Sequence, residues 1–301
     1  MNPAIETQGL TRRFGRNAAV DGLTLSVPQG SIYAFLGPNG AGKTTTIKML
    51  LNILQPSTGT AAILGVDSTR LGPVEFSRIG YVSENQQLPE WMTVEQLIGY
   101  CRPMYGSWDS EFCNKLLAQF ELPRDRKLKS LSRGMKMKAA LLTSLAYRPR
   151  LLVLDEPFTG LDPLVREEVI RGMLELTEQE NWTVFISSHD IDEVERLADW
   201  VGVINAGKIQ LSEAAASLQA RFRRIECVVP NAGRMPPTAP KSWLVPEVTP
   251  HRICFVESEY LPEASEARLR DAFPGASDLT ASEMSLREIF VALARTFRIK
   301  P

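Results

Sequence analysis

Hydrophobic and polar positions along the first two thirds of the chain predict strands that alternate with helices. Leu23, Leu25 and Val27 alternate with polar residues, a pattern typical of a half-buried strand. Residues 43–54 place apolar side chains at helical spacing. Nearly continuous apolar runs, typical of strands buried on both faces, occur at 31–36, 79–82, 151–154, 183–187 and 201–204. This alternation predicts an α/β fold with a mainly parallel sheet.

Two segments depart from that alternation. Residues 93–147 have helical spacing and little strand character, and they open with Thr93-Val94-Glu95-Gln96, which has the form of a capping box. We predict a helical subdomain there, inserted into the core. Beyond residue 215, prolines become frequent around short strand-like runs, and two helical patterns follow. We therefore expect two domains, at 1–215 and 216–301, of which the second is a small α+β accessory domain.

Composition and charge narrow the classes of function. The 301 residues are 44% apolar, and 34 basic residues stand against 35 acidic ones, for a net charge of −1. A protein that binds nucleic acid usually has a basic surface. We therefore expect no nucleic-acid partner. The four cysteines form no C-x-x-C pair, which favours a reducing compartment. No apolar run approaches the ~18 to 20 residues that span a bilayer, so we expect any membrane-spanning part in another chain.

A glycine-rich segment follows the apolar run at 31–36 and precedes the helical pattern. It fits G-x-x-x-x-G-K-[ST], the Walker A loop, whose backbone N–H groups surround phosphate oxygens. Lys43 is expected to reach the β and γ phosphates of ATP, and Thr44 to bind Mg²⁺ through its hydroxyl. The alternative is a chance glycine turn, which the flanking strand and helix disfavour. The predicted phosphate-binding residues are Gly37, Pro38, Asn39, Gly40, Ala41, Gly42, Lys43, Thr44 and Thr45.

The apolar run at 151–154 ends in two adjacent carboxylates, Asp155 and Glu156. The carboxyl ends of parallel strands lie at the same edge of a sheet, so we expect both acids beside the phosphate loop. Asp155 would hold Mg²⁺ through water, and Glu156 would act as general base on the attacking water. Taken alone, the motif could equally be a solvated acidic turn after a buried strand. Its combination with the Walker A loop favours catalysis.

Together these motifs resemble those of the ABC ATPase family, over nearly all of residues 10–211. Leu131-Ser132-Arg133-Gly134-Met135 occupies the place of the family's signature loop and departs from its commonest form, L-S-G-G-Q, at the third and fifth positions. The resemblance implies that Ser132 and Gly134 contact the γ-phosphate bound by an opposite subunit. It also implies a P-loop NTPase core in which an antiparallel β subdomain accompanies the parallel sheet.

Three further residues match the family by position. Asp162 lies in a segment that resembles the D-loop at the dimer interface. His189 resembles the switch histidine that contacts the γ-phosphate, and we assign it to catalysis with Lys43 and Glu156. Phe14 matches the aromatic residue that stacks on adenine, and a core or surface phenylalanine is the alternative.

The segment that corresponds to the Q-loop is less regular. Glu84 aligns with the usual glutamine, although Gln86 and Gln87 lie just beyond it. A glutamate could bind Mg²⁺ through an oxygen, but it adds negative charge near the phosphates and cannot donate an amide hydrogen bond. Trp91 follows, where family members meet their transmembrane partner. It is either an exposed interface anchor or a core residue.

The resemblance implies an ATPase that is cytoplasmic and peripheral on the inner face of the cell membrane. One set of motifs per chain implies a head-to-tail homodimer or heterodimer enclosing two ATP molecules, with a separate transmembrane permease. The signature variant resembles that of exporters of drugs, antibiotic peptides or lipid-like substrates. A GTPase or small-molecule kinase is one rival, but the chain has no N-K-x-D motif. A non-transport ABC protein of DNA repair or translation is another, and such proteins typically carry a coiled-coil insertion or two cassettes.

Overall fold

The computed structural model describes residues 3–84, 86–180, 182–193, 195–229, 235–236 and 239–298. The chain divides into two compact units, Met1–Ser212 and Glu213–Pro301, close to the boundary expected after residue 215. Among the described helices, none combines the length and the apolar character that crossing a membrane requires.

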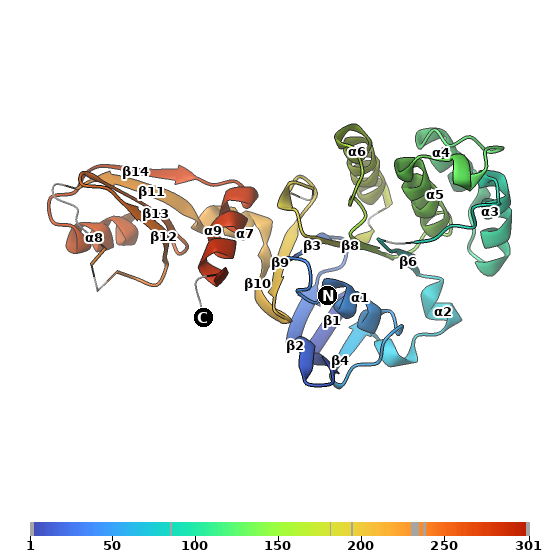
Figure 1. Ribbon diagram of the computed structural model, residues 1–301, viewed down its shortest axis with the longest axis horizontal. Helices are drawn as coiled ribbons and strands as arrows, with labels where there is room; N and C mark the ends of the chain where they lie inside the picture. Colours follow the sequence, from blue (N-terminus) through green and yellow to red (C-terminus); the bar gives the residue numbers. More distant parts are fainter. Residues whose placement is uncertain are drawn as a thin grey trace. The chain divides into compact units, whose positions relative to one another are not determined.

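A six-stranded sheet forms the centre of the N-terminal unit (Figure 1). Its strands follow the order β10 (Lys208–Ala214), β9 (Trp200–Asn205), β3 (Ile32–Leu36), β8 (Thr183–Ser188), β7 (Leu151–Asp155) and β6 (Ile79–Val82). The five strands from β9 to β6 pair in parallel, which confirms the predicted mainly parallel sheet. The carboxyl ends of β3, β7 and β8 therefore lie at one edge.

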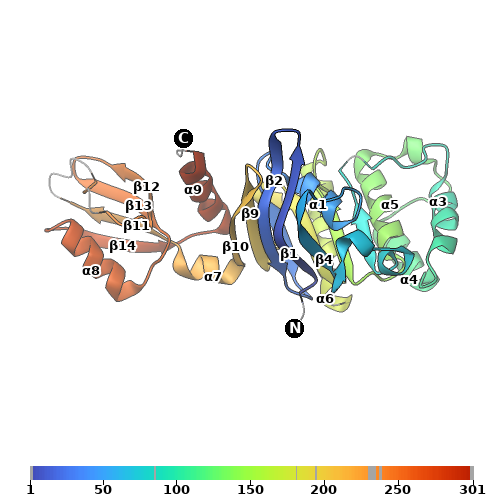
Figure 2. The same cartoon turned by 90° about the horizontal axis from the view of Figure 1, so that it is seen from below.

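A second sheet is antiparallel, as the family resemblance implied, and contains β2 (Asn17–Val27), β1 (Ile5–Phe14), β4 (Thr58–Ile63) and β5 (Val66–Asp67). Helix α1 (Lys43–Leu50) lies between the two sheets, as Figures 1 and 2 show. Ile47 and Met49 of α1 share one hydrophobic core with Leu25 of β2 and Phe35 of β3. The helix ends four residues earlier than predicted, and Asn52 just beyond it has a left-handed φ of 56°. Packing on both sides fixes α1 and the loop before it.

Three helices gather at one end of this unit, where the helical subdomain was expected (Figure 1): α3 (Val94–Cys101), α4 (Ser110–Gln119) and α5 (Arg133–Leu145). The predicted capping box is confirmed, because Thr93 Oγ1 accepts from the N–H of Gln96 at 3.2 Å and Gln96 Oε1 accepts from the N–H of Thr93 at 2.9 Å. Two more helices, α2 (Pro73–Phe76) and α6 (Pro163–Glu180), begin at prolines, whose fixed φ suits a first helical position.

The C-terminal unit is an α+β domain, as predicted. Its antiparallel sheet has the order β12 (Trp243–Val248), β13 (Arg252–Glu257), β11 (Arg223–Val228) and β14 (Ser277–Glu283). Ile225 and Phe255 face a core that includes Leu269 and Phe273, from α8 (Pro262–Ala272) and the residue after it. Two other helices, α7 (Ala215–Arg221) and α9 (Leu286–Arg298), complete the described part of this unit.

Candidate nucleotide-binding site

The loop between β3 and α1 requires glycine because backbone crowds it on two sides. A Cβ on Gly37 would lie 2.3 Å from the carbonyl oxygen of Ile204, and one on Gly42 would lie 2.4 Å from that of Ala19. Gly42 also has a φ of 108°, which L side chains rarely adopt. The tip of the loop, residues 38–40, is exposed. The loop is thus fixed at both ends and accessible at its tip, as an anion-binding turn before a helix must be.

Lys43 begins α1 and is only 6% exposed. Its Nζ donates to the carbonyl oxygens of Gly37 at 2.6 Å and Pro38 at 3.2 Å, and it lies 3.1 Å from Glu156 Oε1. The last contact is an ion pair without hydrogen-bond alignment. An ammonium has three N–H groups, so phosphate oxygens would compete directly with these three partners.

Asp155 ends β7 and lies against the first turn of α1. Its Oδ1 accepts from Thr44 Oγ1 at 3.2 Å and from Ser187 Oγ at 2.7 Å. Mg²⁺ prefers oxygen ligands and often takes only one or two from carboxylates, with substrate phosphates and water supplying the rest. Within the described ranges, no group of three or more His, Cys, Asp or Glu residues could hold a metal ion unaided. The Thr44 and Asp155 oxygens therefore fit Mg²⁺ that arrives with a nucleotide.

Glu156 is buried and has a left-handed φ of 50°, which costs roughly 1–3 kcal/mol in a residue other than glycine. Its Oε2 lies 2.8 Å from His189 Nδ1 and accepts from Thr159 Oγ1 at 3.2 Å. Its backbone N–H donates to Ser187 Oγ at 3.0 Å. The strained turn thus holds one carboxylate between the Lys43 ammonium and the His189 ring, and the three residues assigned to catalysis lie in direct contact.

Sequence reasoning missed Thr159 and Ser187. The Ser187 hydroxyl joins Asp155 to the backbone of Glu156, so it fixes both acids at once. A signal was present, because polar residues end the otherwise apolar run at 183–187 just before His189. The contacts themselves join neighbouring strands, which a pattern along one strand does not reveal.

The signature segment and the D-loop segment lie at two adjoining helix starts. Ser132 is exposed, and its Oγ caps α5 by accepting from the N–H of Met135 at 3.2 Å. Asp162 is exposed and accepts from the N–H of Val165 in α6 at 3.0 Å. Gly134 is buried, and a Cβ there would lie 2.4 Å from Val165 Cγ1. The structure therefore brings Ser132, Gly134 and Asp162 together through helices α5 and α6.

Two other predicted binding residues, Phe14 and Glu84, are exposed. Phe14 is 51% exposed, with the Arg12 guanidinium 4.7 Å from its ring centroid, so it does not belong to the core and its ring is accessible. Glu84 lines a cavity of about 320 Å³ with Arg133 of the signature segment and with Thr159, which binds Glu156, but neither Thr44 nor Asp155 lines it. Of the three proposed Mg²⁺ ligands, Thr44 and Asp155 are joined by a hydrogen bond, and no described hydrogen bond joins Glu84 to either of them.

Trp91 is 68% exposed. The alternative that placed it in the core is therefore wrong.

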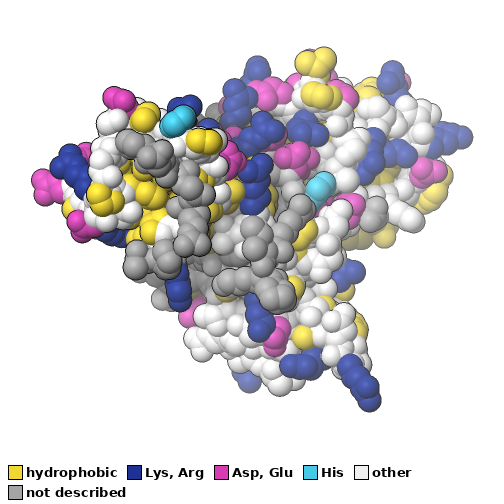
Figure 3. Space-filling view, turned by 60° about the vertical axis from the view of Figure 1, so that its left-hand side comes forward, with side chains coloured by type: hydrophobic (Ala, Val, Ile, Leu, Met, Phe, Trp, Pro, Cys, Tyr) yellow, Lys and Arg dark blue, Asp and Glu magenta, His cyan; other side chains and the backbone are white. Residues whose placement is uncertain are grey.

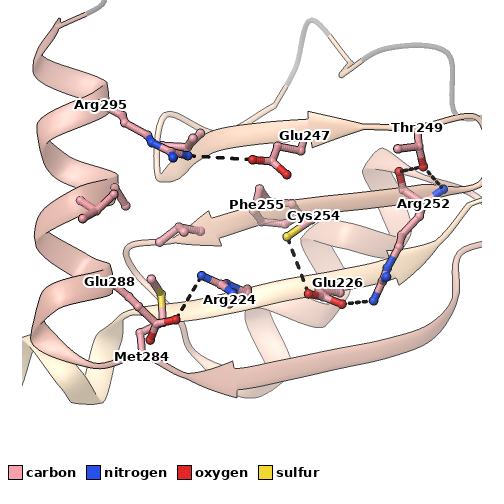
Figure 4. Close-up of a pocket in the computed structure, with 14 residues that line it drawn as sticks. Arg224, Glu226, Glu247, Thr249, Arg252, Cys254, Phe255, Met284, Glu288 and Arg295 are labelled. Atoms are coloured by element: carbon pink, nitrogen blue, oxygen red, sulfur yellow. Dashed lines mark hydrogen bonds and ion pairs between the residues drawn. The ribbon is translucent and has the colours of Figure 1, made fainter.

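Another cavity, of about 400 Å³, lies in the C-terminal unit between α9 and the sheet (Figure 4). Charged side chains of opposite sign line it in pairs: Arg224 with Glu288, Arg252 with Glu226, and Arg295 with Glu247. None of the residues predicted from the motifs lines this cavity. Each guanidinium already has a carboxylate partner, so we do not place the chemistry there.

The N-terminal site, in contrast, combines the parts needed for phosphoryl transfer to water. The loop at 37–42 can surround phosphates, Lys43 supplies positive charge, Thr44 and Asp155 supply oxygen ligands, and Glu156 supplies a base.

Comparison with known proteins gives the same picture. Residues 20–159, which include the loop, Ser132 and Glu156, match the family model described as ABC transporter. Bacitracin transport ATP-binding protein BcrA of Bacillus licheniformis is 36% identical over 211 residues, 69% of this chain and 69% of BcrA. Daunorubicin/doxorubicin resistance ATP-binding protein DrrA of Streptomyces peucetius is 39% identical over 214 residues, 68% of this chain and 64% of DrrA.

Solved structures resemble the chain as well. An ATP-binding subunit of an ABC transporter superposes with a TM-score of 0.66 and 26% identity, over 72% of this chain and 92% of that one. An ATP-binding cassette in its ADP conformation has a TM-score of 0.63 and 27% identity, over 72% of this chain and 93% of the other. The predicted P-loop NTPase fold is therefore confirmed.

Proposed function

Since this chain belongs to the ABC transporter family and is an ATP-binding and ATP-hydrolysing subunit, we propose that Lys43, Glu156 and His189 carry out the hydrolysis of ATP. The observation that supports this most directly is the series of contacts in which the buried Glu156 lies 3.1 Å from the buried ammonium of Lys43 and 2.8 Å from Nδ1 of the partly exposed His189. Burial strengthens the contact between Lys43 and Glu156, because water screens a buried ion pair less than an exposed one.

Lys43 has two tasks in this proposal. It is to hold the phosphates of ATP, and in the structure its ammonium lies 3.1 Å from Glu156 Oε1, the oxygen proposed to take the proton. When the β and γ phosphates of ATP take the Lys43 N–H groups, Glu156 Oε1 loses that partner and can accept a proton from the attacking water. Mg²⁺, bound by Thr44 and Asp155, would supply positive charge to the phosphate oxygens.

His189 orients the base from its other side. Its Nδ1 contacts Glu156 Oε2, and its ring is 38% exposed, so it can also reach a phosphate at the open side of the site. The hydroxyl of Thr159 donates to the same oxygen and fixes it further. The carboxylate thus keeps one oxygen for orientation and one for the water.

The second half of each site would come from another copy or a related chain, in a head-to-tail pair. Ser132 is exposed at the start of α5, where a helix presents its positive dipole end and free N–H groups. We propose that this end meets the γ-phosphate held by Lys43 of the opposite subunit, with Asp162 at the same interface and Phe14 stacked on adenine.

Glu156→Gln tests the assignment of the base. The amide keeps the size of the side chain but cannot take a proton, so we expect ATP hydrolysis to fall by about 10²–10⁴-fold. ATP affinity measured by calorimetry should stay within a few-fold of the parent, and light scattering should show an ATP-dependent dimer. Glu175→Gln, at an exposed position of α6, is the matched control and should hydrolyse ATP normally. Parental turnover by Glu156→Gln would refute the proposal.

Beyond ATP hydrolysis, we propose that the chain binds a transmembrane permease at the cytoplasmic face of the membrane. Two separate observations support this: Trp91 is an exposed aromatic residue, and a cavity of about 350 Å³ is lined by Ile53, Phe76 and Tyr105, which suits an apolar permease loop. The names of BcrA and DrrA favour export of a drug or antibiotic. Co-purification with a co-expressed candidate permease should be lost in Trp91→Ala, and candidate compounds should stimulate ATPase activity of the complex. Undiminished co-purification would exclude Trp91 as an anchor.

A further inference from the structure

One buried carboxylate near the site has no part in the mechanism above. Glu193 ends the short 3₁₀ turn Ile191–Glu193, just after His189 in the chain, and is only 4% exposed. Its Oε2 accepts a hydrogen bond from Ser188 Oγ at 2.5 Å. Its Oε1 lies 3.7 Å from Arg166 Nη2. Burial raises the pKa of the Glu193 carboxyl above its ordinary value.

Ser188 connects this carboxylate to the backbone on both sides of His189. It is the last residue of β8 and fully buried, and its carbonyl oxygen accepts from the N–H of Gly37, the first residue of the phosphate loop, at 3.2 Å. Its Oγ also accepts from the N–H of Asp190 at 3.0 Å. Residues 188 and 190 are therefore fixed through one hydroxyl, and that hydroxyl is oriented by Glu193.

Arg166 connects the same carboxylate to the start of α6. The N–H of Arg166 donates to the carbonyl oxygen of Asp162 at 3.0 Å, so the guanidinium projects from the turn that follows the D-loop segment. Glu193 thus lies between two segments of the proposed ATP site that are far apart in the sequence. A buried charge is expensive to keep, and an apolar residue of similar size is often at least as stabilising at such a position. Stability alone therefore does not account for a carboxylate here.

We propose that Glu193 is a positioning residue, which holds the Ser188-His189-Asp190 turn so that the His189 ring contacts Glu156. This inference rests on the proposed function of His189 and deepens it. Glu193 itself touches neither Glu156 nor the phosphate loop through any of its described hydrogen bonds, and it acts through Ser188.

The first test observes His189 directly. The chain has only two histidines, and histidine side chains, cyan in Figure 3, reach the surface. His251→Asn leaves His189 as the single source of imidazole signals in NMR of histidine-labelled, full-length protein. In that background Glu193→Ala and Ser188→Ala should both shift the His189 ring signals. Glu193→Gln keeps an oxygen for the Ser188 hydroxyl and should shift them less. Unchanged His189 signals in a folded Glu193→Ala protein would overturn the proposal.

The second test is kinetic. If His189 is misplaced, Glu193→Ala should lower kcat by roughly tenfold, because small displacements of catalytic groups are costly, while the Kd for ATP changes less than about twofold. Because Glu193 acts through His189, adding Glu193→Ala to His189→Ala should lower kcat by less than about twofold further. A full additional tenfold loss would contradict action through His189.

Glu167→Gln is the matched control. It removes an exposed ion pair with Arg196 from the same helix as Arg166, and it should leave kcat and the His189 signals unchanged. A loss of activity in this control equal to that of Glu193→Ala would also overturn the proposal. The two hypotheses fail separately: absence of ATPase activity in the parent protein would refute the proposed function, whereas the NMR result reports on positioning without ATP.

Discussion

Replacing Gly134 by alanine should destabilise the chain by overpacking α5 against α6. The added Cβ would lie 2.4 Å from Val165 Cγ1, roughly 1 Å inside the ~3.5 Å optimal separation of two carbon atoms. Val165 cannot retreat freely, because its N–H is bound by the Asp162 side chain at the start of α6. The clash therefore acts on the segment proposed to lie at the dimer interface.

The size of the effect can be bounded. Overpacking a well-packed interior costs about 1–3 kcal/mol. Alanine in place of glycine returns up to about 1 kcal/mol through its higher helix propensity. The net loss in the free energy of unfolding should be about 1–2 kcal/mol, which for a unit of this size corresponds to a fall in Tm of roughly 2–8 °C.

A double-mutant cycle separates packing from other causes. Val165→Ala removes the clashing methyl groups and should cost about 1 kcal/mol alone, because Val165 is only half-buried. In the double variant Gly134→Ala/Val165→Ala the clash is absent, so Gly134→Ala should become neutral or slightly stabilising. Thermal unfolding of the four full-length proteins by calorimetry measures the coupling. The packing argument would be refuted if the two single variants lost stability additively, or if the Gly134→Ala protein were as stable as the parent. Glycine would then be needed at this position only for contact with a ligand.

Three other expectations follow from the geometry. Gly37→Ala should abolish ATP binding, because the added Cβ would lie 2.3 Å from a backbone oxygen. At Gly40 an added Cβ meets open space, so Gly40→Ala should mainly lower the free energy of unfolding by about 1–3 kcal/mol through the φ of 80°. Equal ATP affinities of the two variants would contradict this. A backbone N–H bond and a nearby guanidinium lower the pKa of Asp109 below its ordinary 3.8, so its contribution to stability is present above that value and is lost as the pH falls through the lowered pKa. The Tm difference between the parent and Asp109→Asn should therefore narrow on acidification, and a difference independent of pH would exclude this account. Burial raises the pKa of Cys113 to about 11, so iodoacetamide at pH 8 should modify it only as fast as the chain unfolds, and rapid modification of the folded protein would count against its burial.

The sequence by itself determined the α/β core, the phosphate loop and the family. These features are encoded locally: a strand buried on both faces needs an unbroken apolar run, as in β7, and a loop that approaches other backbone closely needs glycine, as at Gly37. Strands without such patterns escaped prediction. In β14 almost every side chain is exposed, so no alternation marks it, and pairing with β11 decides its conformation.

Only the tertiary structure decided which residues act together. Lys43, Glu156 and His189 come from three separate strand-to-helix connections, and the edge of one parallel sheet brings them within about 3 Å of one another in series. The exposure of Trp91 and the contacts of Glu193 likewise depend on what packs against them. Such contacts join residues distant in the chain, and no periodicity along the chain records them.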